Sequence, residues 1–377
     1  MKLFEPIVDE GRQHQHFKTV LAPEHAASRQ VVEAWADGFP NRDGKFVQEF
    51  QLSFNSPFWE IYLYAVFREY GFDFDWSHAS PDFALTYQGQ SVCVEAVTAN
   101  AADGKPNEWD FRFTPEKPIE LDLEALNREA MVRLANAIYG KHRKYQNSYS
   151  KLGHVAGKPF VLAVAPFEQP RFNHQYNRPI KAVLYDHYVD EPAYQKNPAA
   201  YPNGPPNRNL GFVTKDNGAD IELGVFNDDR MRHISAVLFS CTATYGKVDA
   251  LAPPSEGRRT IVQTIWGSEP DGRPVMRAGY AEETGETLTD GLQIYHNPYA
   301  QNPLDPAVFR RRGVVQNYLD EQAGRWVEEE LTRSLYFRFA VTVVGRDDTT
   351  DATGPNVAES TANKSPPPLA DQEPAID

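Results

Sequence analysis

The sequence predicts an α/β protein in which helices flank a central mixed sheet. Three features predict this fold class: an apolar helical segment near residue 60, a hairpin pattern over residues 82–98, and an apolar strand that follows a long helical segment. A strand, a helix and a second strand in this order are typical of parallel neighbours in a sheet. The 377 residues, 41% of them hydrophobic and 24% charged, suffice for a sizeable core.

The N-terminal part of the chain predicts three elements in succession. Residues 23–37 have a helical pattern, and a turn rich in Gly, Pro and Asn follows over residues 38–44. We expect a short strand over residues 46–50. These elements precede the first segment whose residues indicate a function.

A buried helix is predicted that begins with Ser56 as N-cap and Pro57 at the first helical position, continues through the apolar run 58–70 and ends at Gly71. Glu60 is its only charged residue before Arg68, and no Lys or Arg lies three or four positions away. An interior carboxylate without a local partner is a candidate functional residue. The alternative is a first-turn Glu that favours the helix dipole and accepts a hydrogen bond from the backbone or a tyrosine.

A β-hairpin is predicted next, with strands over residues 82–87 and 92–98 and a Gly-bearing turn between them. Because side chains alternate along a strand, Glu95 shares a face with the apolar residues two positions before and after it. A carboxylate buried there requires a cation, hydrogen bonds or a metal. The hairpin therefore places Glu95 where a partner is needed.

Asp82, at the start of the first strand, is the expected second ligand of a metal at Glu95. Mg²⁺, or Mn²⁺ in its place, prefers carboxylates together with water, phosphate oxygens and a backbone carbonyl such as that of Ala96. The alternative is an Asp in a turn and a Glu that reaches solvent.

In order and spacing these motifs resemble the PD-(D/E)xK superfamily of restriction-endonuclease-like nucleases, and within it a group of largely uncharacterised bacterial proteins. The resemblance covers about residues 50–165, and two later motifs extend it to about residue 305. The matching segments are Phe58–Leu63, Pro81–Phe83, Val94–Ala96, Ile234–Leu238 and His296–Ala300. The resemblance implies a restriction-endonuclease-like core with additional C-terminal strands. It also implies an Mg²⁺-dependent endonuclease or exonuclease that acts on nucleic acid, with DNA preferred to RNA.

One position departs from that superfamily, because Val97 stands where its lysine normally follows the strand Glu. The helix predicted after the hairpin has an apolar stripe that ends at Ile138, and its continuation passes through Lys141. We therefore expect Lys141 to supply the missing positive charge, similar to members that carry the lysine on this helix. The alternatives are a solvated basic helix end over residues 141–144, or a helix that stops at Gly140.

The resulting hypothesis assigns roles to four residues. Asp82 and Glu95 bind the metal, Glu60 binds it or orients water, and Lys141 stabilises charge on the phosphate. The alternative function is a catalytically inactive member of the same fold that binds nucleic acid or a partner protein. Val97 favours that alternative, and the three acids favour the enzyme.

The net charge of −14 counts against a general affinity for nucleic acid. Local basic stretches remain at residues 141–144 and 310–312. Cys93 and Cys241 are expected to be buried thiols. The N-terminus lacks the pattern of a signal peptide and no segment reaches membrane-spanning length, so we expect a cytoplasmic protein without a membrane partner.

The expected organisation is one α/β domain over residues 1–346, with the nuclease-like core at about 50–165. An irregular insertion is predicted at about residues 190–211, and a disordered, acidic and Pro-rich tail over residues 347–377. Strands of the central sheet are expected at Phe160–Ala165, Ile234–Cys241 and Leu292–Tyr295.

Overall fold

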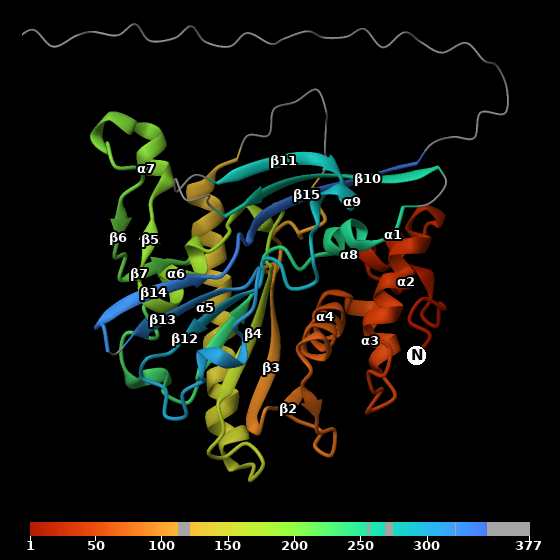
Figure 1. Cartoon of the computed structure of the whole chain (residues 1–377), viewed down its shortest axis with the longest axis horizontal. Coiled ribbons are helices and arrows are strands. Elements are labelled where there is room, and N and C mark those ends of the chain that lie inside the picture. The colour runs from red at the N-terminus through yellow and green to blue at the C-terminus, as the bar shows by residue number, and fades with distance from the viewer. Residues whose placement is uncertain (112–120, 255–256, 268–273, 321, 345–377) are drawn as a thin grey trace, which may run out of the picture. The chain divides into compact units, whose positions relative to one another are not determined.

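An eight-stranded mixed sheet forms the centre of the computed structural model (Figure 1). Its strands are, in spatial order, β1 (Asp73–Phe74), β2 (Phe83–Tyr87), β3 (Gln90–Asn100), β4 (Phe160–Phe167), β9 (Ala236–Phe239), β12 (Gln293–His296), β13 (Val315–Asp320) and β14 (Arg325–Glu330). Strands β3, β4 and β9 run parallel, whereas β12 is antiparallel to β9. The structure describes residues 1–111, 121–254, 257–267, 274–320 and 322–344. The predicted α/β class with a mixed sheet is confirmed.

A second sheet, of three antiparallel strands, was not expected from the sequence. Its strands are, in spatial order, β11 (Val275–Tyr280), β10 (Arg258–Trp266) and β15 (Leu335–Val344). Two small ladders join β5 (Tyr188–Val189) to β6 (Asn207–Arg208) and β7 (Phe212–Thr214) to β8 (Asp220–Glu222). Segment 190–211, predicted to be irregular, contains β6 and two short helical segments.

Helices cover both faces of the central sheet. The α-helices are α1 (Gln15–Val20), α2 (Ala26–Trp35), α3 (Phe46–Ser53), α4 (Asn55–Tyr70), α5 (Leu123–Asn147), α6 (Arg178–Tyr185), α7 (Glu191–Lys196), α8 (Tyr245–Leu251) and α9 (Ala281–Thr284). The 3₁₀ segments are η1 (Glu10–Arg12), η2 (Pro23–His25), η3 (Tyr149–Lys151), η4 (Phe172–His174), η5 (Pro198–Ala200), η6 (Asp229–Met231) and η7 (Pro306–Val308). Helix α4 packs on the face of β3 that carries Val94, and α5 packs on the opposite face with Cys93. The alternation predicted for β3 is confirmed.

Two local expectations of the sequence, and one of its alternatives, are corrected by the structure. Residues 46–50 are helical rather than extended, because Phe46 and Phe50 lie one turn apart and both face the core. Helix α4 begins at Asn55, with Phe54 rather than Ser56 as its N-cap. Helix α5 continues through Gly140 to its end at Asn147. The predicted end of α4 at Gly71, which has a φ of 83°, is confirmed.

The hairpin of β2 and β3 follows the predicted pattern. Gln88 and Gly89 form the turn with φ values of 48° and 81°, the left-handed conformation that two-residue hairpin turns require. Phe83 pairs with Val94 in the antiparallel ladder. This register places the start of β2 beside the middle of β3.

The two late motifs of the resemblance meet in the structure, where they fix β9 to β12. The side chain of Asn297 donates to the carbonyl of Ile234 at 2.8 Å, and its backbone N–H donates to the carbonyl of Ser235. These contacts give both motifs a structural role in this chain.

Cys93 and Cys241 are free and buried. Within the described ranges, no helix has the combined length and apolar character that a membrane crossing requires. Residues 1–344 belong to one unit, and the tail predicted over residues 347–377 lies outside the described residues.

Candidate active site

Glu95 lies in the middle of β3 and is 1% exposed. Its Oε1 accepts hydrogen bonds from Lys141 Nζ at 2.6 Å, Lys144 Nζ at 3.0 Å and the hydroxyl of Tyr149 at 2.9 Å. We refer to these four residues as the Glu95 cluster. The two ammonium groups give this buried carboxylate the partner that its position in the strand requires.

Helix α5 positions the two lysines. Its buried stripe, which includes Leu134 and Ile138, packs against β3 and β4. Lys141 continues that stripe, and Lys144 lies less than a turn further along the same side. Tyr149 begins η3 directly after the helix ends, and its hydroxyl reaches Glu95 in the sheet. The Nζ atom of Lys144 lies 4.8 Å from the centre of the Tyr149 ring.

Asp82 lies next to this cluster. When the pairing of Phe83 with Val94 is continued by one residue, Asp82 comes opposite Glu95, on the same face of the hairpin. Asp82 Oδ2 accepts a hydrogen bond from the backbone N–H of Ala96 at 2.8 Å. The structure therefore brings together two of the three predicted acids across adjacent strands.

Glu60 approaches from helix α4, on the other face of β3. Within the described residues its carboxylate accepts no hydrogen bond and forms no ion pair. Burial raises the pKa of Glu60 to about 8, and the negative charge of Asp82 adds to this effect while Arg42 opposes it. Glu95 influences Glu60 less than Asp82 does, so Glu60 is electrostatically coupled mainly to Asp82.

The three acids differ in protonation near neutral pH. Burial, together with the charge of Glu95, raises the pKa of Asp82 to about 6, against the opposing influence of Lys141. Burial also acts to raise the pKa of Glu95, but the two lysines outweigh it and lower that pKa below its usual value. At neutral pH Glu95 and most of Asp82 are therefore ionised, whereas Glu60 mainly holds a proton.

One atom of the cluster indicates where a cation fits. Glu95 Oε2 is buried and has no hydrogen-bond partner within the described residues. A buried carboxylate oxygen without a partner is costly, and a hard cation shared with Asp82 would satisfy it. The described residues contain no preformed group of three or more His, Cys, Asp or Glu side chains that is arranged to hold a metal. The arrangement therefore fits two carboxylate ligands, and Glu60 as a third ligand stays a prediction.

The sequence did not identify two members of the Glu95 cluster. Lys144 had a usable signal, since it lies three residues after Lys141 on the same helix and a long side chain reaches across that offset. Tyr149 had none, because it lies beyond the end of α5, where the helical period no longer gives the direction of a side chain. Val97 is half-buried and packs against the core on the α5 side, so the strand itself provides no cation.

Known proteins provide no match from which a function could be transferred to this site. No protein-family model, no curated protein and no solved structure matches the chain. The geometry of the site therefore carries the functional assignment.

Proposed function

We propose that this protein hydrolyses phosphodiester bonds of nucleic acid in a metal-dependent reaction, with residues 50–165 as a restriction-endonuclease-like core. One observation carries the proposal: Glu95, buried in β3, has an unpartnered oxygen beside Asp82 while two lysines hold its other oxygen. This arrangement combines ligands for a hard cation with positive charge for a phosphate.

Each residue has a role that its surroundings support. Asp82 and Glu95 would hold Mg²⁺ or Mn²⁺, which acts as a Lewis acid on phosphate oxygens and lowers the pKa of bound water. Lys141 keeps Glu95 ionised and places positive charge near the phosphate. Glu60, with a pKa of about 8, exchanges a proton near neutral pH and so suits proton transfer to or from water.

A second function is favoured by a different observation. Three donors already satisfy Glu95 Oε1, and no lysine stands at Val97, so the cluster is compatible with a catalytically inactive member of the fold. Such a protein binds nucleic acid or a partner protein without cleaving it. The two functions differ in whether the chain turns over a substrate.

Cleavage of plasmid DNA, single-stranded DNA and RNA by the purified full chain, with Mg²⁺ or Mn²⁺, tests the proposal. We expect metal-dependent cleavage by the parent, with DNA preferred, and a loss of about 10²-fold or more in Glu95→Gln and Asp82→Asn. The matched control is Asp75→Asn, since Asp75 is an exposed acid nearby in sequence whose carboxylate contacts only Ser77 and His78 among the described residues.

The two acid variants must retain the parent's circular dichroism spectrum and remain folded at the assay temperature. Full cleavage by both of them overturns the assignment of the site. Absence of cleavage in the parent with every substrate, together with retained binding of nucleic acid, supports the inactive alternative.

A further inference from the structure

A pocket of about 430 Å³ lies between the C-terminal end of α4, the second sheet and the segment 284–290. Its charged lining consists of four arginines and two acids. These residues are Arg277, Arg311, Arg312, Arg333, Glu69 and Asp290. We refer to it as the arginine pocket.

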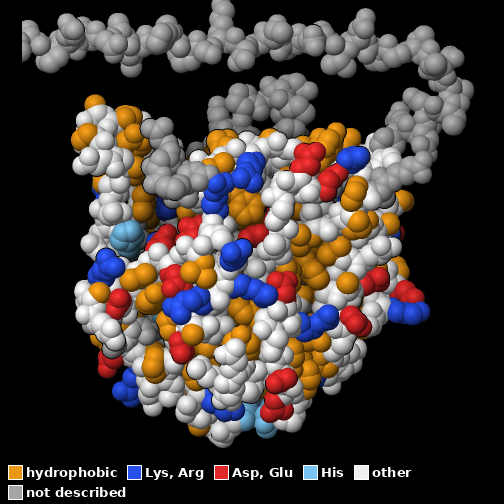
Figure 2. Space-filling view, viewed as in Figure 1, with side chains coloured by type: hydrophobic (Ala, Val, Ile, Leu, Met, Phe, Trp, Pro, Cys, Tyr) orange, Lys and Arg blue, Asp and Glu red, His pale blue; other side chains and the backbone are white. Residues whose placement is uncertain are grey.

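The positive charges that line this pocket outnumber the negative ones, four to two. Arg311 pairs with Glu69 at 3.4 Å and lies 4.7 Å from the ring centre of Tyr70. Within the described ranges, the guanidinium groups of Arg277 and Arg312 form no ion pair and donate no hydrogen bond. Positive charge thus gathers here on a chain whose net charge is −14. Figure 2 shows Lys and Arg interspersed with Asp and Glu over the face that it displays, without one broad basic region.

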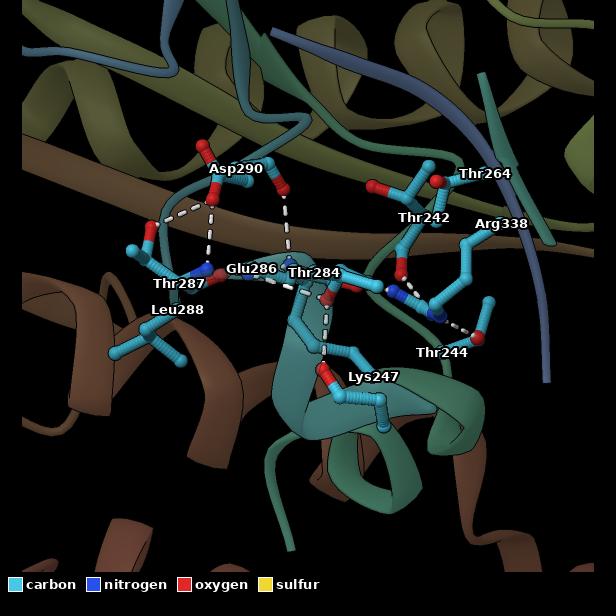
Figure 3. A network of polar contacts seen from close by, with 12 residues as sticks. Thr242, Thr244, Lys247, Thr264, Thr284, Glu286, Thr287, Leu288, Asp290 and Arg338 are labelled. Atoms are coloured by element: carbon cyan, nitrogen blue, oxygen red, sulfur yellow. Dashed lines mark hydrogen bonds and ion pairs between the residues drawn. The ribbon is translucent and has the colours of Figure 1, made fainter. Parts of the chain in front are cut away.

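Buried contacts hold one wall of the pocket from behind (Figure 3). Lys247, which is 0% exposed, donates to Glu286 Oε1 at 2.7 Å and to the carbonyls of Thr287 and Asp290 at 3.1 and 2.9 Å. Arg338 from β15 donates to the same Glu286 oxygen at 2.6 Å. The segment 284–290 is therefore fixed before any ligand arrives, which reduces the entropic cost of binding.

The acid of this wall, Asp290, is held in place by hydrogen bonds from Thr287. Asp290 Oδ2 accepts hydrogen bonds from the backbone N–H of Thr287 at 2.6 Å and from its hydroxyl at 2.9 Å. Gly313 has a φ of 76°, and a Cβ there would lie 2.0 Å from Asp290 Oδ1. Only glycine allows this close approach, which sets the preceding Arg311 and Arg312 at the rim of the pocket.

The arginine pocket is separate from the candidate active site. Glu60 and Glu69 both belong to α4, nine residues apart, which corresponds to ~13 Å along the helix and about 180° around it. The side of α4 that carries Glu69 also contacts the pocket wall, because the hydroxyl of Tyr62 donates to the carbonyl of Leu288 at 3.0 Å. Binding in this pocket does not require the cleavage proposed above.

We propose that the arginine pocket binds a ligand with two or more phosphate groups, either a free nucleoside diphosphate or triphosphate or the backbone of a nucleic acid. Guanidinium groups bind phosphate oxygens through paired N–H donors, which makes arginine the preferred residue for such ligands. Among the threonines of the lining, Thr332 accepts from the backbone N–H of Gly313, so its hydroxyl proton can be donated to a ligand. The volume lies within the range of about 300–1,000 Å³ that is typical of small-ligand sites.

Isothermal titration of the full chain in EDTA tests this inference, with inorganic diphosphate and a short single-stranded DNA as the two probes. The variant is Arg277→Gln/Arg312→Gln. Its matched control is Arg232→Gln/Arg325→Gln, which removes two exposed arginines outside the pocket and changes the net charge equally. We expect the parent to bind at least one probe, the pocket variant to bind about tenfold more weakly or worse, and the control to match the parent.

Preference for diphosphate supports a free nucleotide as the natural ligand, and preference for DNA with a strong dependence on salt supports a nucleic-acid backbone. No binding of either probe by the parent, or an equal loss in the control, overturns the inference. Because EDTA removes divalent metal, the result is independent of whether the chain cleaves nucleic acid.

Discussion

Two buried glutamates of this protein are each held by two cationic side chains, and the comparison between them identifies the site. Glu95 bonds to two lysines whose side chains are 22% and 50% exposed. Glu286 bonds to Lys247 and Arg338, whose side chains are 0% and 1% exposed. Both glutamates also have an Oε2 atom without a hydrogen-bond partner among the described residues. Burial, double pairing and an unpartnered oxygen therefore do not distinguish a functional site from a structural one.

The neighbours of each glutamate make the difference. Beside Glu95 lie Asp82 and Glu60, two acids with raised pKa values, and the lysines reach solvent. Beside Glu286 lies Asp290, whose carboxylate is bonded to Thr287, and the cations are enclosed. The first arrangement is open to a cation and a phosphate, whereas the second fixes a wall of the arginine pocket.

The largest expected effect is on stability at Glu286. Glu286→Gln leaves two buried cations without their anion, so we expect the free energy of unfolding to fall by about 3–5 kcal/mol. Glu95→Gln should cost about 1 kcal/mol or less, because its lysines can turn to solvent. Urea denaturation followed by circular dichroism measures both. Equal losses would remove the distinction between the two clusters.

The next effect separates the two lysines of the Glu95 cluster. The side chain of Lys141 is more buried than that of Lys144 and lies closer to Glu95 Oε1. Lys141→Met should therefore lower the rate of cleavage by about 10²-fold. Lys144→Met should lower it by about tenfold at most, because half-exposed charges are screened. Initial rates at saturating substrate compare them. A larger loss in Lys144→Met would show that Lys144, and not Lys141, supplies the catalytic charge.

The third effect concerns the dependence of stability on pH. The pKa of Glu60 is raised from 4.5 to about 8 in the folded state, so the folded protein holds this proton more tightly than the unfolded chain does. The resulting stabilisation is complete below pH 4.5 and is lost as the pH rises through about 8. Glu60→Gln should flatten the decline in unfolding free energy over this range. An unchanged slope in this variant would show that Glu60 does not titrate there.

The smallest effect is expected at the hydroxyl that completes the Glu95 cluster. Tyr149→Phe removes one of three hydrogen bonds to Glu95 Oε1 and should lower the free energy of unfolding by about 1 kcal/mol. The matched control is Tyr145→Phe on α5, since within the described residues the hydroxyl of Tyr145 makes no hydrogen bond. Thermal or urea denaturation compares the two. A loss confined to the control would contradict the role of Tyr149.

Local patterns predicted the elements that place the candidate site. The apolar residues of α4, the alternation of β3 and the stripe of α5 are periodic signals within single segments, and they fixed which face carries Glu95 and Lys141. The strand predicted over residues 46–50 was wrong, because a five-residue segment with Phe at each end fits one helical turn as well as a strand.

Local sequence patterns could not predict contacts between segments that are far apart in the chain. Lys247 in α8, Glu286 in the loop after α9 and Arg338 in β15 are separated by 39 and 52 residues, and nothing in any one segment indicates that they meet. The second sheet was missed for the same reason, since β10 pairs with β15 across a long stretch of chain. Tyr149 joins Glu95 only through the turn that follows α5.

The central claim is that Glu95 and Asp82 hold a divalent metal, and titration calorimetry with Mn²⁺ tests it most directly. We expect the parent to bind Mn²⁺ with release of protons, since ionisation of the neighbouring acids accompanies binding. Glu95→Gln should lose this binding, while Glu286→Gln, measured under conditions where it is folded, should retain it. Equal Mn²⁺ binding by the parent and Glu95→Gln, or no binding by the parent, would contradict the claim.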